Sequence, residues 1–355
     1  MTSPAEQDAF AAAAASSPVA QPRFRAGDYV RDRYRILRLI GKGGMGEVYE
    51  AEDTDEGRRV ALKTILRELI SGEKALARFE REIELSQRVS HPNVLRIYDV
   101  FELDAGLEEG GRRIPCLVME LLDGETLADR LGREPRIDTD AAWTIVRQMC
   151  AGLGAAHRGG VIHRDLKPDN IFLIQDADGS TRAVLTDFGV ARPLSGEGHR
   201  DEGSLDSLTA TNVILGTPTY MAPEQLELEV ATPASDIYTI GLVIYEMVTG
   251  KQPFEAESAL KTVFKRIKEQ PTPPSEHVPD LDPGWEAVIL RCLARHPEDR
   301  FPDADAIADA LPVPTAHLDA TEDGAGGAAG LSTTATFVLI ALGLIALSAA
   351  LVWLL

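Results

Sequence analysis

Two short polar motifs in the second half of the sequence carry side chains suited to phosphoryl transfer. Residues 163–170 read His-Arg-Asp-Leu-Lys-Pro-Asp-Asn, and Asp187-Phe188-Gly189 begins seventeen positions after Asn170. Asp165 can accept the proton of an acceptor hydroxyl, while Asn170 and Asp187 offer the hard oxygen ligands that magnesium prefers. A lone Asp or Asn in such a segment is usually a turn former. Because eight specified positions are followed by a second motif, the pattern predicts phosphoryl transfer from Mg-ATP.

A glycine-rich segment near the amino end predicts a binding loop for the nucleotide phosphates. Residues 34–40 alternate in polarity as a strand does, and they run into Gly-Lys-Gly-Gly-Met-Gly-Glu-Val-Tyr at 41–49. Glycines let the backbone approach phosphate oxygens without a clash from Cβ. A strand rather than a helix is expected after the loop, which distinguishes it from a dinucleotide-binding fingerprint. We therefore expect a strand, a glycine loop and a second strand.

Lys63 and one glutamate of the next helix are the expected charge partners beside this loop. Lys63 ends an apolar run, and a Lys within an apolar strand needs anionic partners such as ATP phosphates and a carboxylate. The segment from about 72 to 89 is predicted to be a helix. Glu82 is expected to pair with Lys63, because it lies three residues after Phe79 and so near the same helix face. The other two glutamates of this helix are expected to be solvated.

The following residues predict further strands, a hinge and then a mainly helical half. Two strands are expected on either side of the polar loop 104–113, and Asp123-Gly124 then breaks the pattern as a hinge between lobes would. Asp138 or Thr139 can cap a helix that runs to about 159 with an apolar period of 3.6 residues. Residues 235–249 are apolar on nearly every face. We expect them to form a helix buried at the centre of the second lobe.

Both ends of the chain differ in composition from the middle. Residues 1–26 have little that could form a core and lack the basic start and long apolar stretch of a signal peptide, so they are predicted to be a disordered leader. Residues 312–334 are rich in Pro, Gly, Ala and Thr and are predicted to be a flexible linker. Residues 335–355 are predicted to be a transmembrane helix. They carry no charge, and the nineteen residues from Phe337 onward would span about 28 Å as a helix.

Membrane insertion is favoured over a buried core helix for this tail, because no charged residue interrupts it and a flexible linker precedes it. Residues 301–355 contain no Lys or Arg, so the positive-inside rule gives no orientation. A domain that consumes ATP needs the cytoplasm. We therefore expect a single-pass protein of the cell (inner) membrane, with its amino-terminal bulk in the cytoplasm and its chain ending inside or just across the bilayer.

Composition restricts the partners. A chain of 355 residues with 44% apolar residues can form one large catalytic unit with a real core. The net charge of −20 and the lack of a basic run make nucleic acid an improbable partner, since phosphate backbones are held by Lys and Arg clusters. Cys116, Cys150 and Cys292 are widely spaced among apolar neighbours. They suggest buried thiols in a reducing compartment rather than a disulfide framework or a zinc site.

Residues 34 to about 310 resemble a Hanks-type serine/threonine protein kinase of the bacterial membrane-anchored group. The resemblance rests on parts that follow the family's order, namely the Gly41 loop, Lys63, Glu82, the Asp165 loop, Asp187-Phe188-Gly189, Ala222-Pro223-Glu224, Asp236 and Arg300. It implies an α+β, two-lobed protein kinase fold over residues 27–311, plus the carboxy-terminal transmembrane helix. The amino-terminal lobe, to about 122, would be β-rich with one main helix. The carboxy-terminal lobe would be mainly helical.

The resemblance also implies a site for ATP and Mg²⁺, with Mn²⁺ as an alternative ion. The family's catalytic positions fall on Lys63, Glu82, Asp165, Lys167, Asn170 and Thr217, and its metal ligands on Asn170 and Asp187. Its ATP-binding positions fall on Ile40, Gly41, Lys42, Gly43, Gly44, Met45, Gly46, Val48, Ala61, Lys63, Met119, Glu120, Leu122 and Phe172. Glu120 and Leu122 would offer backbone groups to adenine, and Met119 would be the gatekeeper. Lys167 and Thr217 resemble the serine/threonine subgroup, so Ser or Thr hydroxyls of proteins are the expected acceptors.

Control by phosphorylation is implied by Arg164. In kinases of this kind an arginine beside the catalytic aspartate pairs with a phosphorylated residue of the activation segment. Thr209 and Thr211 are the expected autophosphorylation sites, and the alternative is that they are ordinary polar loop residues. A transient homodimer through the amino-terminal lobe is a further open alternative, by analogy with bacterial relatives.

Two other functions remain open at this point. A catalytically weak pseudokinase scaffold at the membrane would keep the fold, but pseudokinases typically lose one or more of the Lys, Asp or Asn positions that are present here. A small-molecule phosphotransferase on a related fold is the second alternative. Such an enzyme would have no use for the segment 216–224, which in protein kinases docks the substrate chain.

Overall fold

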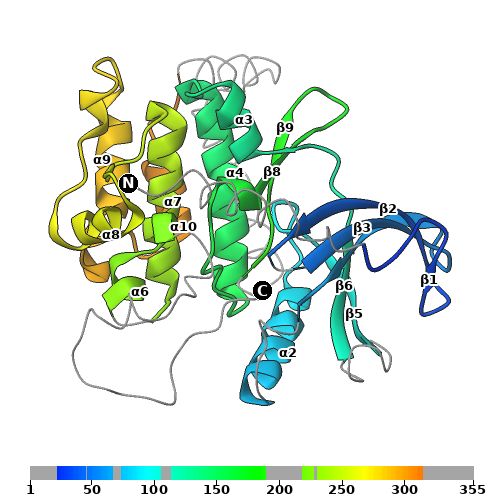
Figure 1. Cartoon of the computed structure of the whole chain (residues 1–355). Helices are drawn as coiled ribbons and strands as arrows, with labels where there is room; N and C mark the ends of the chain where they lie inside the picture. Colours follow the sequence, from blue (N-terminus) through cyan, green and yellow to red (C-terminus); the bar gives the residue numbers. More distant parts are fainter. Residues whose placement is uncertain are drawn as a thin grey trace, which may run out of the picture. The chain divides into compact units, whose positions relative to one another are not determined.

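In a computed structural model of the chain, the amino-terminal lobe is an antiparallel sheet with one long helix beside it (Figure 1). The structure describes residues 22–44, 46–66, 73–104, 113–188, 218–227 and 230–314. The sheet has the strand order β1-β2-β3-β4-β6-β5. Its elements are β1 (Tyr29–Val30), β2 (Tyr34–Gly43), β3 (Gly46–Asp53), β4 (Arg58–Thr64), β5 (Ile97–Asp104) and β6 (Arg113–Glu120), and the helix is α2 (Glu73–Arg88).

The two faces of this sheet pack differently. On one face Tyr34, Tyr49 and Leu62 are buried in a cluster that includes residues of β5 and β6. Around α2 a second cluster forms, in which Phe79 of the helix packs with Leu117 of β6. The predicted β-rich lobe with one main helix is therefore confirmed, and alternation along β2 identified its first long strand correctly.

The carboxy-terminal lobe is mainly helical and contains a small sheet of order β7-β8-β9 (Figure 1). Its elements are β7 (Glu125–Thr126), α3 (Leu127–Arg133), α4 (Thr139–Arg158), η3 (Pro168–Asn170), β8 (Ile171–Gln175), β9 (Thr181–Leu185), η4 (Pro218–Tyr220), α6 (Pro223–Glu227), α7 (Pro233–Thr249), α8 (Ala259–Lys268), η5 (Pro274–Glu276), α9 (Pro283–Cys292), η6 (Pro297–Asp299) and α10 (Ala304–Ala310). Together with the sheet of the first lobe they give the two-lobed α+β arrangement that the resemblance implies.

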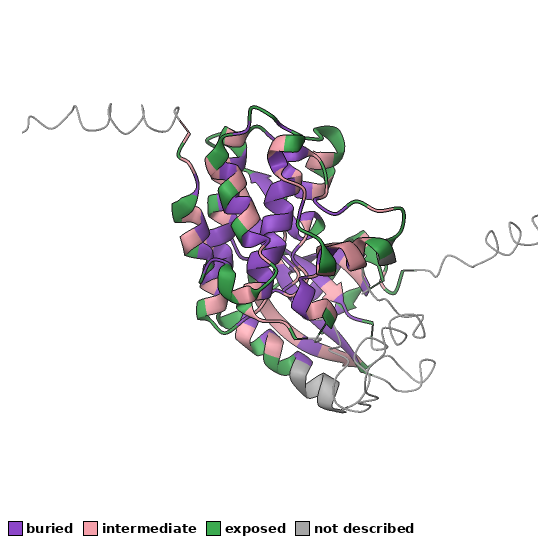
Figure 2. Ribbon diagram, turned by 90° about the vertical axis from the view of Figure 1, so that its left-hand side faces the viewer, coloured by how far each residue is buried: buried purple, intermediate pink, exposed green. Residues whose placement is uncertain are grey.

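Helix α7 lies at the centre of this lobe, as its apolar sequence predicted. Nearly every side chain between Ser235 and Thr249 is buried, and Figure 2 shows buried residues running through the central helices. Thr232 caps its first turn, and Gly250 ends it at a φ of 69°, a conformation that glycine adopts without strain. The predicted cap of α4 is also confirmed, since the Asp138 side chain accepts a hydrogen bond from the N–H of Asp140.

The turn that follows α2 ties the helix to the second lobe. Leu95 N donates to Leu185 O and Leu185 N donates to Asn93 O, each at 2.9 Å. The Asn93 side chain also donates to Ala183 O at 2.7 Å. Because Leu185 ends β9 just before Asp187, backbone pairing sets where the end of α2 lies relative to the second chemical motif.

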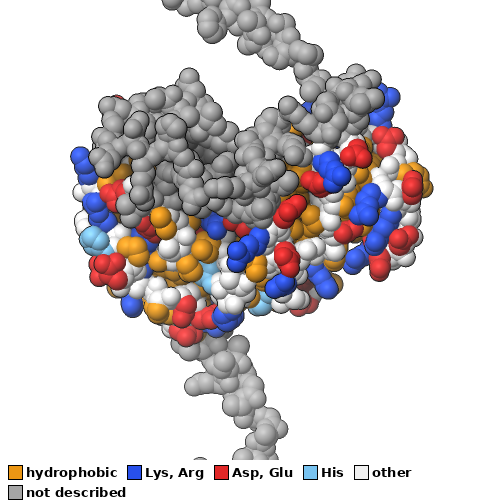
Figure 3. All heavy atoms as spheres, turned by 90° about the horizontal axis from the view of Figure 1, so that it is seen from below, with side chains coloured by type: hydrophobic (Ala, Val, Ile, Leu, Met, Phe, Trp, Pro, Cys, Tyr) orange, Lys and Arg blue, Asp and Glu red, His pale blue; other side chains and the backbone are white. Residues whose placement is uncertain are grey.

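The three cysteines are free and buried, as expected. Burial raises the pKa of Cys116 and of Cys292 to about 12, so these thiols are protonated at neutral pH. On the face shown in Figure 3, basic and acidic side chains are interspersed among the described residues.

The chain divides into two units, Met1–Leu311 and Pro312–Leu355. Residues 1–21 of the predicted leader, most of the predicted linker and the whole predicted transmembrane helix lie outside the described residues. None of the helices in the described ranges has both the length and the apolar character that crossing a bilayer requires.

Candidate active site

The backbone of the loop 163–170 is held by the buried carboxylate of Asp236 on α7. Its Oδ2 accepts a hydrogen bond from His163 N at 2.7 Å, and its Oδ1 accepts one from Arg164 N at 2.9 Å. The His157 ring nitrogen Nε2 lies 2.7 Å from the same Oδ2. Arg164 has a φ of 64°, which a non-glycine residue adopts only at a cost in energy. Two charge-assisted hydrogen bonds to a carboxylate that is 1% exposed offset that cost.

Asp165, Lys167 and Asn170 lie together at the end of this loop. The Asn170 side-chain nitrogen donates to Asp165 O at 2.7 Å and to Asp165 Oδ2 at 3.2 Å. Lys167 Nζ lies 3.3 Å from the same Oδ2. The carboxylate of Asp165 is thus fixed by one neutral and one cationic donor, and a fixed carboxylate suits the role of general base.

Asp187 lies two residues after the end of β9 and is linked to the same loop. Thr186 donates to Asn170 O through its backbone N at 2.9 Å and its hydroxyl at 3.2 Å. Asp187 itself has a φ of 56°, the second strained non-glycine residue of the site. The next residue, Phe188, is buried against the His163 ring with centroids 4.5 Å apart. Burial lowers the pKa of His163, so its ring is neutral at neutral pH and packs as an apolar group.

Lys63 pairs with Asp187 in this structure, and not with Glu82 as the sequence predicted. Lys63 Nζ lies 2.5 Å from Asp187 Oδ1, while the Glu82 carboxylate pairs with the guanidinium of Arg164. The side chains of Lys63 and Arg164 are 12% and 17% exposed. Because largely buried cations need a carboxylate close by, each takes one of the two acids available. The prediction of a Lys63–Glu82 pair was therefore wrong for this structure. The choice of Glu82 as the glutamate that points inward is consistent with its burial, because Glu82 is partly buried whereas Glu80 and Glu84 are exposed, as expected.

The glycine loop joins β2 and β3, as predicted. The strands pair Gly41 with Val48, Lys42 with Glu47 and Gly43 with Gly46. Gly46 has a φ of 144°, and a Cβ on it would lie 1.8 Å from the carbonyl oxygen of Thr64. Only glycine fits this position, because any side chain would collide with the backbone of β4.

The residues expected around the adenine lie on adjacent strands and at the hinge. Strand pairing sets Val48 opposite Lys63 and Ala61 opposite Met119. The N–H of Glu120 is used within the lobe, where it donates to Arg96 O at 2.9 Å, so its carbonyl is the group that it can offer to a base. Of the other expected positions, Ile40, Gly41, Lys42 and Gly43 lie on β2, Gly44 lies in the turn after it, Leu122 follows β6, and Phe172 lies on β8.

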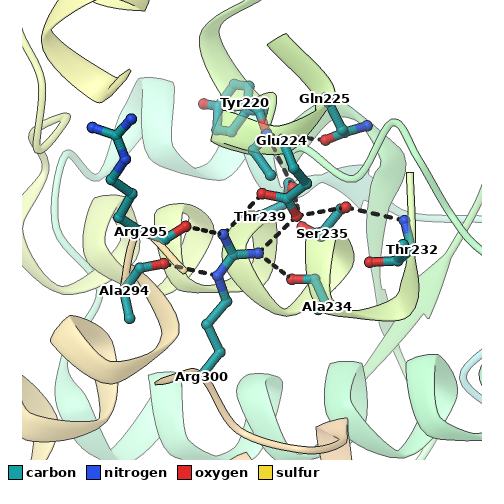
Figure 4. A network of polar contacts seen from close by, with 11 residues as sticks. Tyr220, Glu224, Gln225, Thr232, Ala234, Ser235, Thr239, Ala294, Arg295 and Arg300 are labelled. Atoms are coloured by element: carbon teal, nitrogen blue, oxygen red, sulfur yellow. Dashed lines mark hydrogen bonds and ion pairs between the residues drawn. The ribbon is translucent and has the colours of Figure 1, made fainter. Parts of the chain in front are cut away.

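Helix α6 is anchored by a buried ion pair (Figure 4). Arg300 NH1 and NH2 donate to the two carboxylate oxygens of Glu224 at 2.8 and 2.9 Å, and the same guanidinium donates to Ala294 O, Ala234 O and Arg295 O. Ser235 of α7 donates to Glu224 Oε1 at 2.7 Å. Burial raises the pKa of Glu224, but the hydrogen bonds from Arg300 and Ser235 outweigh it, so the net pKa is below the ordinary value. Both partners were among the family positions recognised in the sequence.

Met45, Thr209, Thr211 and Thr217 of the predicted site, with Gly189 of the second motif, lie outside the described residues. The structure adds residues that sequence reasoning missed. His157, which contacts Asp236, lies in the last turn of the amphipathic helix α4, and no motif marks it. Tyr220, Glu246 and Gln252 form a polar cluster between η4 and α7, in which the Tyr220 hydroxyl donates to Glu246 Oε2 at 2.5 Å.

The arrangement brings a fixed carboxylate, an ammonium and an amide together on one loop and connects that loop to Asp187 and Lys63. Asn170 donates through its amide nitrogen, so its amide oxygen is the atom that could coordinate a cation. The carboxylate of Asp187 is a second hard oxygen donor close by in the chain fold. These residues fit a magnesium-assisted transfer of a phosphoryl group to a hydroxyl.

Known proteins with similar sequences and folds agree with this geometry. Residues 34–310 match the family model described as the protein kinase domain. Over 287 residues the chain is 37% identical to serine/threonine-protein kinase PknA of Mycobacterium tuberculosis, covering 81% of this chain and 62% of that protein. Over 282 residues it is 36% identical to serine/threonine-protein kinase pkn3 of Myxococcus xanthus, covering 79% and 49%. The crystal structure of the Mycobacterium tuberculosis PknI kinase domain gives a TM-score of 0.62 at 26% identity, covering 81% of this chain and 98% of that chain.

The match to the family model extends over more than half of the chain, so this chain belongs to the protein kinase family. Its relatives are bacterial serine/threonine kinases, which confirms the resemblance to the Hanks type. The chain spans about half of the length of the curated relatives it matches, from 41% to 62%.

Proposed function

We propose that this chain is a serine/threonine protein kinase that transfers the γ-phosphoryl group of Mg-ATP to Ser or Thr hydroxyls of proteins. The observation that carries the proposal is the fixed carboxylate of Asp165, with Asn170 and Lys167 bonded to it and Asp187 and Lys63 paired beside it. The similarity to bacterial serine/threonine kinases supports the choice of acceptor.

The chain's own residues divide the work of the reaction. Asp165 accepts the proton of the acceptor hydroxyl. The hydroxyl oxygen bonds to the γ-phosphorus of ATP while the bond between the γ-phosphorus and the β-phosphate oxygen breaks, which releases ADP. Lys167, beside Asp165, offsets charge on the transferred group. Asn170 and Asp187 would hold the metal ions, which neutralise the phosphate charge when bound. Lys63 would bind the nucleotide phosphates.

Phosphate transfer by the purified full chain tests the proposal. Wild-type protein with Mg-ATP should label itself and a general acceptor such as casein, and acid hydrolysis should return phosphoserine or phosphothreonine. Asp165→Asn should lower the rate about 10²- to 10⁴-fold, because it removes the general base. Lys63→Met should act in the same direction. Asp178→Asn, an exposed turn residue that accepts from Ser180, is the matched control and should leave the rate unchanged.

If the wild-type protein binds ATP but transfers phosphate neither to itself nor to an acceptor, the pseudokinase alternative is favoured over the kinase proposal. Transfer to free hydroxyl metabolites without any transfer to protein would favour the small-molecule phosphotransferase instead.

We also propose that Arg164 links activity to phosphorylation. Its guanidinium pairs with Glu82, the glutamate expected to serve Lys63. A phosphate on Thr209 or Thr211 would offer Arg164 about one to three stronger, charge-assisted hydrogen bonds. The Arg164–Glu82 ion pair would then break, and Glu82 could pair with Lys63 in place of Asp187. The Asp187 carboxylate would then be available to coordinate the metal. Exchange between two sets of ion pairs would thus couple the activation segment to the nucleotide site.

For the whole chain we propose a kinase tethered to the inner membrane by residues 335–355, with its catalytic unit in the cytoplasm. The proposal is supported by the charge-free sequence of that tail and by the need for cytoplasmic ATP. Tethering would confine substrates to proteins at or near the membrane. Pairing of two copies through the amino-terminal lobe stays a prediction.

A further inference from the structure

Arg266 of α8 is a buried arginine whose side chain reaches another segment of the chain. The residue is 2% exposed. Its NH1 donates to Met221 O at 2.9 Å, and its NH2 donates to Thr219 O. The guanidinium also lies 5.7 Å from the centroid of the Phe254 ring. A buried cation with fork geometry can bind two carbonyl oxygens at once, so Arg266 fixes their relative position.

The carbonyl between these two is held as well. Thr239 of α7 donates through its hydroxyl to Tyr220 O at 3.0 Å (Figure 4). Three successive carbonyls, at 219, 220 and 221, therefore accept hydrogen bonds from side chains of two different helices. Residues 219–221 are half-buried at the end of η4, where backbone carbonyls withdrawn from water need such partners. Here the partners come from α7 and α8, and they determine the path of the segment.

Hydrogen bonds of one side chain, that of Gln225, link the end of this segment to the catalytic loop. The N–H of Ala222, the residue after Met221, donates to Gln225 Oε1 at 2.9 Å, and Gln225 Nε2 donates to Arg164 O at 3.5 Å. Arg164 is the residue before Asp165. A shift of the backbone at 219–221 could therefore be transmitted through Gln225 to Arg164, the neighbour of the proposed general base.

We propose that Arg266 is a positioning residue for the acceptor protein: it holds the backbone of residues 219–221 in the path against which the acceptor chain docks. This inference rests on the proposed function and on the expectation from the family resemblance that the segment 216–224 docks the substrate chain. Arg266 is not among the residues expected to bind ATP or to contact the reacting atoms. Its loss should weaken acceptor binding and spare nucleotide binding, since none of the expected nucleotide residues lies on α8 or in the segment 219–221.

Steady-state kinetics of the full chain with casein as acceptor test the proposal. Arg266→Met keeps the length and helix propensity of the side chain but removes both donors. It should raise the KM for casein by at least about tenfold, equivalent to about 1.4 kcal/mol of binding, and leave the KM for ATP within about twofold. Arg266→Lys keeps the charge without the fork and should give an intermediate KM.

Lys265→Met is the matched control. Lys265 is the neighbouring cation on α8, and its Nζ donates to Glu255 O, away from the segment 219–221. It should leave both KM values unchanged. Thr239→Val, which removes the third bond to the segment, should raise the KM for casein in the same direction as Arg266→Met.

The proposal is overturned if Arg266→Met and Arg266→Lys both keep the wild-type KM for casein. It is also overturned if the KM for ATP rises as much as the KM for casein, because Arg266 would then support the fold in general. If Arg266→Met does not fold, the comparison of Arg266→Lys with wild type decides. If the wild-type protein phosphorylates no acceptor, the proposed function itself is wrong. If the wild-type protein is active and the Arg266 variants match it, only the role of Arg266 is wrong.

Discussion

At the scale of single residues, the site depends on strained backbone that specific side chains hold in place. Arg164 and Asp187 both have positive φ values without being glycine. Such conformations persist only where the surroundings determine them, and they are common at catalytic sites. For Arg164 the determinant is Asp236, whose carboxylate accepts from two consecutive N–H groups and contacts His157.

Asp236→Asn should therefore impair both stability and catalysis. An amide has one acceptor oxygen, so one of the two N–H groups would face an NH₂ group. We expect the free energy of unfolding to fall by about 1–3 kcal/mol, the cost of a buried donor without its charged acceptor. Misplacement of Asp165 should lower kcat by up to about a hundredfold. Urea denaturation and casein phosphorylation measure the two effects. Asp305→Asn, in an exposed pair with Arg158, is the control and should change neither.

The exchange proposed for Glu82 can be measured as a coupling energy. In unphosphorylated protein, a double-mutant cycle with Glu82→Gln and Arg164→Gln should give an interaction of about 0.5–3 kcal/mol in the free energy of unfolding. In protein phosphorylated in trans by wild type, the coupling should disappear, because Arg164 would have left Glu82. The exposed pair Glu84–Arg88 on the same helix is the control and should give about 0.3–0.5 kcal/mol in both states. Equal Glu82–Arg164 coupling in both states would contradict the exchange.

The sequence could identify Glu82 but not its partner. The 3.6-residue period set Glu82 apart from its neighbours on the helix, and the structure confirms that it is less exposed than they are. The partner of Glu82 depends on which of the two cations, Lys63 or Arg164, lies closer to it in the folded chain. Those two residues lie 101 positions apart in sequence, from 63 to 164, and no local pattern reports that distance.

At the scale of elements, the β2–β3 hairpin shows how one position can fix a loop. Gly46→Ala would bring a Cβ to 1.8 Å from Thr64 O at a φ of 144°, so the hairpin must move away from β4. We expect Gly46→Ala to lower the melting temperature and raise the KM for ATP. Gly43→Ala is the stability control, because a Cβ there meets no atom within 4 Å, and it should leave the melting temperature unchanged. A Gly46→Ala protein as stable as wild type would show that the loop tolerates the shift.

The anchor of α6 gives a pH-dependent prediction. The pKa of Glu224 is lowered in the fold, so the ion pair with Arg300 contributes stability above the ordinary Glu value of 4.5 and loses it as the pH falls through the lowered native pKa. Glu224→Gln should cost about 3–5 kcal/mol at pH 7, since it leaves Arg300 buried without its carboxylate. The difference from wild type should shrink below pH 4.5. Urea denaturation at several pH values measures it.

Glu227→Gln on the same helix is the matched control for that experiment. Glu227 pairs with Arg295 in an exposed position. Its substitution should change the free energy of unfolding by less than about 1 kcal/mol at every pH. A pH-independent effect of Glu224→Gln would mean that packing, and not the charge, stabilises α6.

Most elements could be predicted because their signals are local. Alternation identified β2, the apolar period and Asp138 identified α4, and the uniformly apolar run identified α7. Contacts between elements were harder to predict. Arg266 lies on a short amphipathic helix where arginine is usually solvent-exposed, and its burial follows from the approach of residues 219–221. Glu224 and Arg300 were recognised as family positions, but the ion pair between them was not predicted.

At the scale of the whole molecule, each lobe has its own hydrophobic core. Polar contacts join the two lobes, together with Val89 and Val94, which follow α2 and are buried in the core of the second lobe. The sheet of the first lobe packs around residues such as Tyr49, while the second lobe packs around α7. The ion pairs Lys63–Asp187 and Glu82–Arg164 each connect one lobe with the other. Because ion pairs can exchange partners without exposing apolar surface, these two pairs can rearrange while both cores stay intact.

The proposed membrane tail predicts where the chain is found in cells. Full-length protein should sediment with the membrane fraction and resist extraction by carbonate, whereas protein truncated after residue 334 should be released. Leu344→Arg combined with Leu347→Arg should have the same effect as truncation. Each Arg at the centre of a transmembrane helix costs about 2.5–3.5 kcal/mol, so two should prevent insertion.

Two arginines placed in the predicted linker, at Ala328 and Ala329, provide the matched control, because that segment is expected to be solvated. They should leave the protein in the membrane fraction. Kinase activity on casein should be the same for all of these variants in detergent, since the catalytic residues lie between 40 and 300. If the Leu344 and Leu347 variant stayed in the membrane fraction, association would have to come from the catalytic unit or a bound partner. The tail would then have no role as an anchor, and confinement of substrates to the membrane surface would need another cause.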